Sequence, residues 1–500
     1  MNLHQFLNHY GLSRNPFAEE DAQTDPVFKN HCILGTHHPT WDKVYGDPAE
    51  PGTSVVFGEK GSGKTAIRLQ IAKYIRQWNA EHPQQRLAVV HYDDFNPFLD
   101  RFADKQHGRK RPDKVLAQWK LWDHLDAILA LSVTGIVDRV LDAQHRPERV
   151  DVEVAPLDVE RLSRSQARDL LLLAACYNQS TADTYVGRWS QLRKIADFTV
   201  FHTYLDLAGG IAWTVFYVFL LIMLWSYGWL TTLQPFWLHV LLLLAGWGPW
   251  AVRSARMWWM ARAIVKQVRV SNLATSQVYR VLKRFPYAEL VSQPLPRSAR
   301  SDDRYEMLDK LLAILKTWKH QGLIVLVDRV DEPHLVNGSP ELMRALIWPL
   351  LDNKFLKYPG VGIKLMLPIE LYRYVEKEGT EFYQRARLDK QNLVTSFDWT
   401  PEALLDVANA RIKACDQDGR PNTLREWIDP SVNDRRLLDA IGSLRVPRHV
   451  FKFLYRLLVA HCHAHSAEQP SWVISSQLFE TTLALDLREQ ATLDRGLTSG

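Results

Sequence analysis

The sequence predicts an α/β fold, a parallel sheet with helices on both faces, interrupted by an inserted helical hairpin and followed by a helical C-terminal part. Three observations predict it. Short apolar, β-branched runs bounded by polar residues recur along the chain, as buried parallel strands do. A long stretch in the middle carries no charge, and the spacing of apolar residues is helical from Pro401 onward. The predicted strands are Thr53–Phe57, Ala88–Phe95, Gly322–Val327, Val361–Leu367 and Leu393–Phe397.

Length and composition are those of a folded protein of several parts. A chain of 500 residues is long enough for roughly two to four structural units. The net charge of +5, with histidine neutral, is mild for this length and does not by itself point to nucleic acid. The 4 cysteines are far apart and form no CxxC pair, which is typical of reduced cytosolic thiols.

A glycine-rich loop follows the first predicted strand. Residues 58–65 read GEKGSGKT and match GxxxxGK[ST], and a run with helical periodicity follows them. The glycines let backbone N–H groups approach phosphate oxygens, and the helix N-terminus adds a field that favours anions. Lys64 is expected to reach the β- and γ-phosphates, and the Thr65 hydroxyl to bind magnesium. The motif predicts a site for ATP with Mg²⁺ formed by Gly58, Glu59, Lys60, Gly61, Ser62, Gly63, Lys64 and Thr65.

An acidic sequence follows the strongest apolar run of the second half. Gly322–Val327 ends in Asp328-Arg329-Val330-Asp331-Glu332. A magnesium–nucleotide site needs a carboxylate at the end of a neighbouring strand, so Asp328 is expected to hold the metal, directly or through water. Glu332, or else Asp331, is expected to act as general base toward the attacking water. The alternative is a strand followed by an acidic turn.

The two motifs together resemble the additional-strand class of P-loop ATPases, which includes AAA+ and STAND proteins. The acidic sequence at residues 328–332 is similar to that of NACHT-type STAND ATPases. Residues 10–17, YGLSRNPF, resemble the opening of general-secretion ATPases of the ExeA type. An apolar insertion between the nucleotide motifs is similar to that of the KAP family of membrane-anchored ATPases. The resemblance implies a P-loop NTPase fold and ATPase activity.

The uncharged stretch predicts a membrane hairpin. From Leu207 to Val252 there is no Asp, Glu, Lys or Arg. Two spans of about 20 residues fit, at 208–230 and 235–252, joined by Thr231–Gln234. Basic residues flank the stretch on both sides and none lies at its tip, so both termini are expected to be cytoplasmic. Because the resemblance implies a bacterial origin, the expected location is the inner membrane, with two spans. The alternative is a pair of buried core helices in a soluble protein.

Residues beyond the acidic motif predict further parts of an ATPase of this kind. Where AAA+ proteins carry a polar sensor residue, this chain has Pro368, and Glu370 is the nearby substitute. Arg385 and Arg387 are the candidates for an arginine that reaches the γ-phosphate of a neighbouring subunit; the alternative is a solvated surface pair. Residues 442–448, GSLRVPR, resemble the sensor-2 region of AAA+ lids, which implies that Arg448 contacts nucleotide.

The resulting hypothesis is a membrane-anchored cytoplasmic ATPase that uses ATP and magnesium as a conformational or oligomerisation switch. By family analogy the expected setting is stress or antiviral signalling, with a homo-oligomer and an unidentified protein partner. Two alternatives remain: an AAA+ helper acting on nucleic acid, which the hairpin and the modest charge disfavour, and a nucleotide-binding secretion scaffold with little turnover. The predicted parts are the first half of the core at 1–98, a helical insertion at 99–301 with the hairpin at about 208–252, the second half of the core at 302–400, and a helical lid at 401–500.

Overall fold

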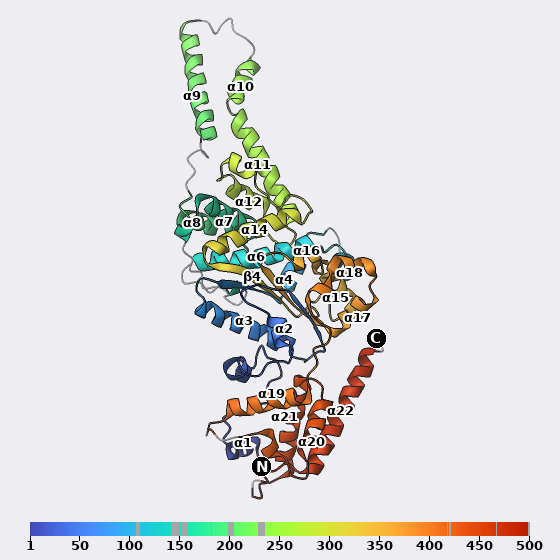
Figure 1. Ribbon diagram of the computed structural model, residues 1–500. Coiled ribbons are helices and arrows are strands. Elements are labelled where there is room, and N and C mark those ends of the chain that lie inside the picture. The colour runs from blue at the N-terminus through green and yellow to red at the C-terminus, as the bar shows by residue number, and fades with distance from the viewer. Residues whose placement is uncertain are drawn as a thin grey trace. The chain divides into compact units, whose positions relative to one another are not determined.

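The computed structural model describes the chain except residues 107–110, 142–149, 152–158, 182, 199–204, 229–235, 418, 420–421, 467 and 499–500. The chain forms two compact units (Figure 1). Unit 1 combines Met1–Asp94 with Leu323–Gly500, and unit 2 comprises Phe95–Gly322. Unit 2 is therefore inserted into the sequence of unit 1. The finer division into four parts remains a prediction.

Unit 1 contains the central strands and most of the short helices. Its strands are β1 (Ser54–Gly58), β2 (Arg86–Tyr92), β4 (His320–Val327, of which Leu323 onward belongs to this unit), β5 (Val361–Pro368) and β6 (Asn392–Val394). Its helices and helical turns are α1 (Leu3–His9), η1 (Phe28–Cys32), α2 (Trp41–Tyr45), α3 (Lys64–Glu81), α15 (Pro340–Ile347), η5 (Trp348–Leu350), α16 (Asn353–Leu356), α17 (Ile369–Lys377), α18 (Thr380–Ala386), η6 (Leu388–Lys390), α19 (Pro401–Cys415), η7 (Leu424–Trp427), α20 (Asp434–Ser443), α21 (Pro447–Ala464) and α22 (Ser476–Thr498).

The five strands of unit 1 form a parallel sheet in the order β2-β4-β5-β1-β6. In the register of β1, Val56 lies opposite Met366 of β5 and Val55 opposite Leu393 of β6. In the register of β4, Val327 lies opposite Leu365. The predicted α/β fold with a parallel sheet is confirmed. In this order β5 lies between β1, which leads into the glycine-rich loop, and β4, which ends at Asp328.

The strands form because their residues are buried on both faces. Every residue of β1 and of β5 is buried, as expected for a parallel sheet covered by helices. On one face Val56 and Met366 share a core with Ile67 and Ile71 of α3. On the other, the Phe57 ring lies 5.3 Å from that of Tyr372 in α17.

Two predicted strands are longer than the observed ones. The strand predicted at residues 88–95 is β2, Arg86–Tyr92, because the carboxylates of Asp93 and Asp94 begin the polar edge of the sheet. The strand predicted at 393–397 is β6, Asn392–Val394. There the Ser396 hydroxyl donates a hydrogen bond of 2.6 Å to Asp398 Oδ1, and such local side-chain bonds favour a turn over a ladder.

The C-terminal helices form a core of their own together with the N-terminal segment. Phe6 and Leu12 lie in one buried cluster with Trp427, Leu454 and Phe479. The helix α19 begins as its sequence predicts, since the Thr400 hydroxyl accepts a hydrogen bond from Ala403 N and Pro401 is its first residue. This cluster is separate from the core under the sheet.

In its described residues, unit 2 is helical apart from the two-residue strand β3 and the first three residues of β4. Its elements are α4 (Asn96–Asp104), α5 (Pro112–Leu116), α6 (Leu121–Val140), β3 (Val150–Asp151), η2 (Val159–Arg161), α7 (Arg164–Tyr177), α8 (Tyr185–Ile195), α9 (Leu205–Ser226), α10 (Phe236–Ala245), α11 (Gly248–Gln267), α12 (Thr275–Leu282), α13 (Tyr287–Val291) and α14 (Asp302–Thr317).

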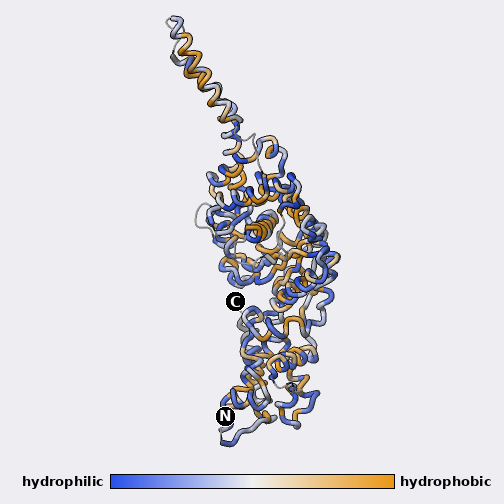
Figure 2. Tube along the Cα trace, turned by 90° about the vertical axis from the view of Figure 1, so that its left-hand side faces the viewer, coloured by the Kyte–Doolittle hydropathy of each residue, from blue (hydrophilic) through white to orange (hydrophobic). Residues whose placement is uncertain are grey.

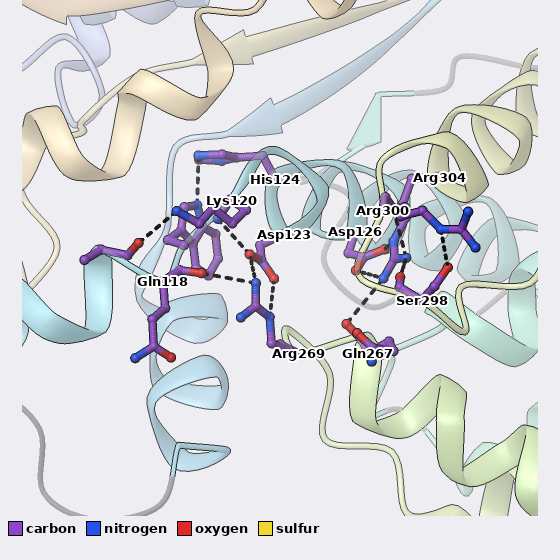
Figure 3. Close-up of polar contacts among 12 residues, drawn as sticks. Gln118, Lys120, Asp123, His124, Asp126, Gln267, Arg269, Ser298, Arg300 and Arg304 are labelled. Carbon is purple, nitrogen blue, oxygen red and sulfur yellow. Dashed lines mark hydrogen bonds and ion pairs between the residues drawn. The ribbon is translucent and has the colours of Figure 1, made fainter.

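A buried ion pair joins the helices of unit 2 (Figure 3). Asp126 of α6 accepts two hydrogen bonds of 3.1 Å from the Arg304 guanidinium of α14, and neither side chain is exposed. The Tyr177 hydroxyl of α7 donates a third hydrogen bond, of 2.9 Å, to Asp126. Arg269, just beyond α11, pairs with Asp123. Because a buried charge is tolerated only when it is paired, this network fixes the mutual packing of α6, α7 and α14.

The described residues of the uncharged stretch form one long helix and one interrupted one (Figure 1), and Figure 2 shows the hydrophobic colour of this part of the chain. In the described part of the chain, Leu207–Ser226 of α9 is the one helical segment long and apolar enough to cross a membrane, and 11% of it is buried. The second predicted span, 235–252, is not a single helix: α10 ends at Ala245 and α11 begins at Gly248. Pro249 explains the break, because it has no N–H to continue the hydrogen bonds of α10. The predicted tip, Thr231–Gln234, lies outside the described residues.

The two apolar segments of the stretch are in contact. The Trp213 indole N–H of α9 donates a 3.0 Å hydrogen bond to the carbonyl of Leu242 in α10. Gly246 lies against the Trp213 ring, and a Cβ at this position would collide with it. The Tyr217 hydroxyl lies 2.8 Å from His239 Nδ1. These contacts make α9 and α10 neighbours, as a hairpin requires.

Candidate phosphate-binding site

The glycine-rich loop leads directly from β1 into α3. Gly61 and Gly63 have φ angles of 88° and 96°, a region that other residues rarely adopt. A Cβ at Gly58 would lie 2.6 Å from Ser62 Oγ, and one at Gly61 would lie 2.7 Å from the Cβ of Arg448. Ser62 is fully buried, and its Oγ has no hydrogen-bond partner within the described residues. The loop thus needs glycine both for its backbone shape and for its tight packing.

Lys64, the first residue of α3, turns back over the loop. Its Nζ donates hydrogen bonds of 2.8 Å to the carbonyl oxygens of Gly58 and Glu59. Burial lowers the pKa of Lys64, and the nearby carboxylates of Asp328, Asp331 and Glu370 oppose that effect. A half-buried ammonium group whose hydrogen bonds within the described residues go to neutral carbonyls is a strong candidate to bind an anion.

The predicted metal ligands meet across 263 residues of sequence. The Thr65 hydroxyl donates a 2.9 Å hydrogen bond to Asp328 Oδ2. Asp328 follows the last residue of β4 and is 2% exposed. Because β1 and β4 are parallel strands of one sheet, their carboxyl ends lie at the same edge, and the loop after β1 therefore reaches the carboxylate after β4.

A buried arginine that the sequence analysis did not identify binds the same carboxylate. Arg68 Nε lies 3.2 Å from Asp328 Oδ2, and Arg68 Nη1 lies 2.5 Å from Asp93 Oδ2. The Arg68 side chain is 2% exposed. One guanidinium therefore pairs with two carboxylates, one after β2 and one after β4. A signal for this contact exists in the sequence: Arg68 is four residues after Lys64 on one helix, and Asp93 directly follows a strand.

The residues after Asp328 form a polar turn. Arg329 has a φ of 58°, in the left-handed region that favours glycine. Its guanidinium lies 3.4 Å from both Asp21 Oδ2 and Glu332 Oε2. Asp331 accepts a 3.0 Å backbone hydrogen bond from Gly338 N through its carbonyl oxygen.

Glu332 lies at the mouth of the site rather than inside it. Its side chain is 57% exposed. Partial burial raises the pKa of Glu332, as do the carboxylates of Asp331 and Asp328, whereas Arg329 lowers it. A raised pKa in a carboxylate that still contacts solvent suits a group that accepts a proton from water.

The C-terminal helices contact the loop directly. The backbone N–H of Arg448, at the start of α21, donates a 3.4 Å hydrogen bond to the carbonyl oxygen of Gly61. Arg445 pairs with Glu59, and the Trp399 indole donates a 2.7 Å hydrogen bond to the carbonyl oxygen of Ser62. Arg448 therefore lies beside the loop; its contact with nucleotide stays a prediction.

A cavity of about 450 Å³ opens beside these residues. Its charged lining includes Lys60, Lys64, Asp328, Asp331, Glu332, Glu370 and Arg448. Its apolar and aromatic lining includes Phe28, Ile67, Phe397, Trp399 and Phe451. Its volume is in the range of small-molecule sites, and an apolar lining with a few charged groups is typical of them.

No protein-family model, curated protein or solved structure matches this chain. The site is therefore interpreted from its own geometry. The described residues contain no group of three or more histidine, cysteine or acidic side chains placed to hold a metal ion by themselves. A metal here would depend on Thr65, Asp328 and oxygens of a ligand, as magnesium commonly does in nucleotide sites.

The structure brings together most of the predicted site residues. Lys60, Gly61, Gly63, Lys64, Thr65, Asp328, Asp331, Glu332 and Arg448 all line the cavity. Glu59 instead pairs with Arg445. Arg385 and Arg387 are not among the residues that line the cavity; Arg385 lies over the Phe382 ring, and Arg387 is 3.8 Å from Asp389. The rings of His38, Phe397 and Trp399 also line the cavity and contact one another. This aromatic cluster was not predicted, because its members are far apart in sequence.

We expect the free energy of unfolding to depend on pH because of His38. His38 is 3% exposed, its ring is stacked on Phe397 at 3.6 Å, and its Nε2 lies 2.9 Å from the Asp398 carbonyl oxygen. Burial lowers the pKa of His38 from 6.5 to about 4, although the Asp398 carbonyl opposes this. The pKa of His38 is lower in the folded protein than in the unfolded one. The contribution of neutral His38 to the free energy of unfolding is therefore complete above pH 6.5 and is lost as the pH falls through 4.

The measurement compares the wild type with His38→Gln, which retains hydrogen-bonding capacity but does not titrate. Between pH 6.5 and pH 4 the unfolding free energy of the wild type should fall by up to about 3 kcal/mol more than that of the variant. Thermal unfolding scans over this pH range provide the comparison. Parallel pH profiles for the two proteins would contradict the assignment.

Proposed function

We propose that this chain is a membrane-anchored P-loop ATPase that binds ATP with magnesium and hydrolyses it as a conformational switch. The observation that carries the proposal is the contact between Thr65 and Asp328, 2.9 Å apart, beside a half-buried lysine at the end of a glycine-rich loop. A hydroxyl and a carboxylate at this spacing are the pair that binds magnesium in ATPases of this type.

The donors of the loop fit a triphosphate. Gly61 and Gly63 adopt left-handed φ angles, which let consecutive backbone N–H groups face an anion without interference from a Cβ. The buried Ser62 hydroxyl has no partner in the described part of the chain. The ammonium group of Lys64 is held by two carbonyl oxygens and is available to the β- and γ-phosphates.

The residues around the loop would bind the metal, accept a proton and supply positive charge. Thr65 and Asp328 would hold magnesium, which supplies positive charge to the phosphate oxygens. Glu332, or else Asp331, accepts the proton of the attacking water. Arg448 provides a positive charge beside Gly61, and its contact with the loop couples the C-terminal helices to the nucleotide.

The strand order supports membership of the additional-strand class of P-loop ATPases. β5 separates β1, which carries the loop, from β4, which carries Asp328. This one extra strand between the two nucleotide motifs gives that class its name. The AAA+ and STAND resemblance of the motifs points to the same class, and to a lid formed by residues 401–500.

Membrane anchoring rests on the exposed apolar helix α9. Of the segment Leu207–Ser226 only 11% is buried, and its side chains Val215, Phe219 and Trp225 are 64%, 65% and 72% exposed. Such a surface is stable in lipid and not in water. With α10 and the start of α11 as the second, kinked span, both termini lie on the cytoplasmic side of a bacterial inner membrane.

Cys32 provides a direct test of nucleotide binding. It lines the cavity and is partly exposed, whereas Cys176, Cys415 and Cys462 are buried. ATP with magnesium, at ten times its dissociation constant, should slow alkylation of Cys32 by N-ethylmaleimide by about tenfold. Burial raises the pKa of the Cys32 thiol, so the reaction is followed at pH 8 by mass spectrometry of the full chain in detergent.

The variant Asp328→Asn separates magnesium binding from nucleotide binding. It should weaken the protection given by ATP with magnesium and leave the protection given by ATP alone unchanged. Cys32→Ser identifies the labelled site. If millimolar ATP leaves the alkylation rate of the wild type unchanged in both conditions, the proposed nucleotide site is wrong.

A further inference from the structure

The exposed face of α11 combines tryptophan and basic side chains. The helix buries Met257, Met260, Ala261 and Ile264 along one side. Its opposite side presents Val252, Trp258 and Trp259, which are 51%, 39% and 64% exposed. The basic residues Arg256, Arg262 and Lys266 are exposed between and beyond them. This set of six residues is called the α11 face below.

The sequence around the α11 face is basic and free of acids. From Leu207 to Ala288 there is no Asp or Glu. The same stretch contains eight basic residues, all after the apolar helices: Arg253, Arg256, Arg262, Lys266, Arg269, Arg280, Lys283 and Arg284. A positive charge so concentrated attracts anions over a distance of about 8 Å at physiological ionic strength.

The exposed cations are packed on aromatic rings rather than on carboxylates. The Arg262 guanidinium lies 5.3 Å from the centre of the Trp258 ring, and that of Arg256 lies 5.6 Å from the centre of the Tyr287 ring. Lys283 Nζ is 4.8 Å from the ring of Trp250. No carboxylate of the described residues forms an ion pair with Arg256, Arg262 or Lys266. The charges of Arg256 and Arg262 therefore rest against aromatic rings and are not neutralised by a carboxylate of the described residues.

We infer that the α11 face binds the anionic headgroups of the bilayer in which α9 and α10 are anchored. The inference rests on the membrane part of the proposed function and adds the lipid class and the residues that recognise it. Tryptophan prefers the boundary between hydrocarbon and water, and arginine binds phosphate through several donors. Trp259 lies about 9 Å along the helix from Arg253, the first charge after the apolar stretch, and is therefore within about two helical turns of the end of that stretch.

A lipid surface accounts for the α11 face better than a nucleic acid does. Nucleic-acid sites also combine basic and aromatic side chains, but the α11 face continues directly from the apolar helices α9 and α10. Val252 and Trp259 add exposed apolar surface next to that stretch, which an anionic membrane covers and a phosphodiester chain does not. The two partners are separated by experiment.

The test uses the full chain in neutral detergent with fluorescently labelled phosphatidylglycerol, and identically labelled phosphatidylcholine as the neutral probe. Phosphatidylglycerol should bind at least about fivefold more tightly than phosphatidylcholine. The triple variant Arg256→Gln, Arg262→Gln, Lys266→Gln should bind both lipids equally. A matched triple variant at exposed lysines elsewhere in unit 2, Lys114→Gln, Lys316→Gln, Lys319→Gln, should keep the preference.

Each result decides the inference. Equal binding of the two lipids by the wild type overturns it while leaving the anchoring intact, and a chain that stays soluble and binds neither lipid overturns the anchoring itself. If the variant at Lys114, Lys316 and Lys319 also loses the preference for the anionic lipid, the effect is one of nonspecific charge and the inference is overturned. Displacement of the anionic lipid by DNA at equal phosphate concentration assigns the face to nucleic acid. The variant Arg256→Lys, Arg262→Lys, which keeps the charge, should keep at least part of the preference, and this guards against a folding defect in the glutamine variant.

Discussion

Replacing Lys64 with methionine should lower ATP turnover by at least about 100-fold, the usual loss when one preorganised donor to a reacting phosphate or oxyanion is removed. The Lys64 ammonium is held by hydrogen bonds of 2.8 Å to the carbonyl oxygens of Gly58 and Glu59. Methionine fills similar space without a charge, so the backbone of the loop should remain as it is. Turnover is measured as phosphate release by the full chain in detergent with saturating magnesium.

Two variants accompany this measurement. Lys73→Met removes an exposed lysine from the same helix and should leave turnover unchanged. Glu332→Gln should abolish turnover but keep ATP binding, because its side chain is 57% exposed at the mouth of the site and holds no part of the loop. If Lys64→Met hydrolyses ATP at the wild-type rate, Lys64 does not contact the transferred phosphate. If the wild type binds ATP without turnover, the chain is a nucleotide-binding scaffold.

Replacing Arg68 with methionine should destabilise unit 1 by about 3–5 kcal/mol, the cost of breaking a buried ion pair by removing one partner. Arg68 is 2% exposed and pairs with both Asp328 and Asp93. Without it, the Thr65 hydroxyl is the one side-chain hydrogen-bond donor to Asp328 among the described residues, and Asp328 loses its ion-pair partner. The destabilisation should appear as faster hydrogen exchange in α3 and at the ends of β2 and β4.

A second substitution tests whether the loss comes from the ion pairs. The double variant Arg68→Met, Asp93→Asn removes one of the two carboxylates together with its partner, and it should recover part of the lost stability. Lys73→Met, on the exposed side of α3, should change the exchange rates little. Wild-type exchange in Arg68→Met would show that the contact contributes nothing to stability.

Sequence patterns were sufficient for the site residues that belong to one continuous motif. Gly58–Thr65 follows a buried strand and opens a helix, and Asp328 ends the strongest apolar run. Both positions follow from patterns within a few residues of the chain: an apolar strand, a glycine-rich loop and a helix with apolar periodicity. The parallel sheet then brings the two segments together, since the carboxyl ends of its strands share one edge.

Contacts between distant segments could not be predicted in the same way. His38, Phe397 and Trp399 form one aromatic cluster, but no periodicity links residue 38 to residue 397. Helical periodicity places Arg68 next to Lys64. Its ion pairs with Asp93 and Asp328, however, depend on the order of the strands, which the sequence does not show. In the apolar stretch, composition suggested two spans, whereas the missing N–H of Pro249 divides the second one.

The shared core of the first and last segments has a consequence for how this chain folds during synthesis. The Ser13 N–H bonds the Cys415 carbonyl at 2.9 Å, the Tyr10 hydroxyl bonds the Trp472 carbonyl at 2.8 Å, and Phe6 packs against Trp427 at 5.8 Å. Ser13 therefore leaves the ribosome 402 residues before its partner Cys415, and this core cannot close until the later segment has been made. Until then Phe6, Leu7 and Leu12 remain accessible to chaperones, and the candidate phosphate-binding loop lacks its contact with Arg448 until α21 has been synthesised.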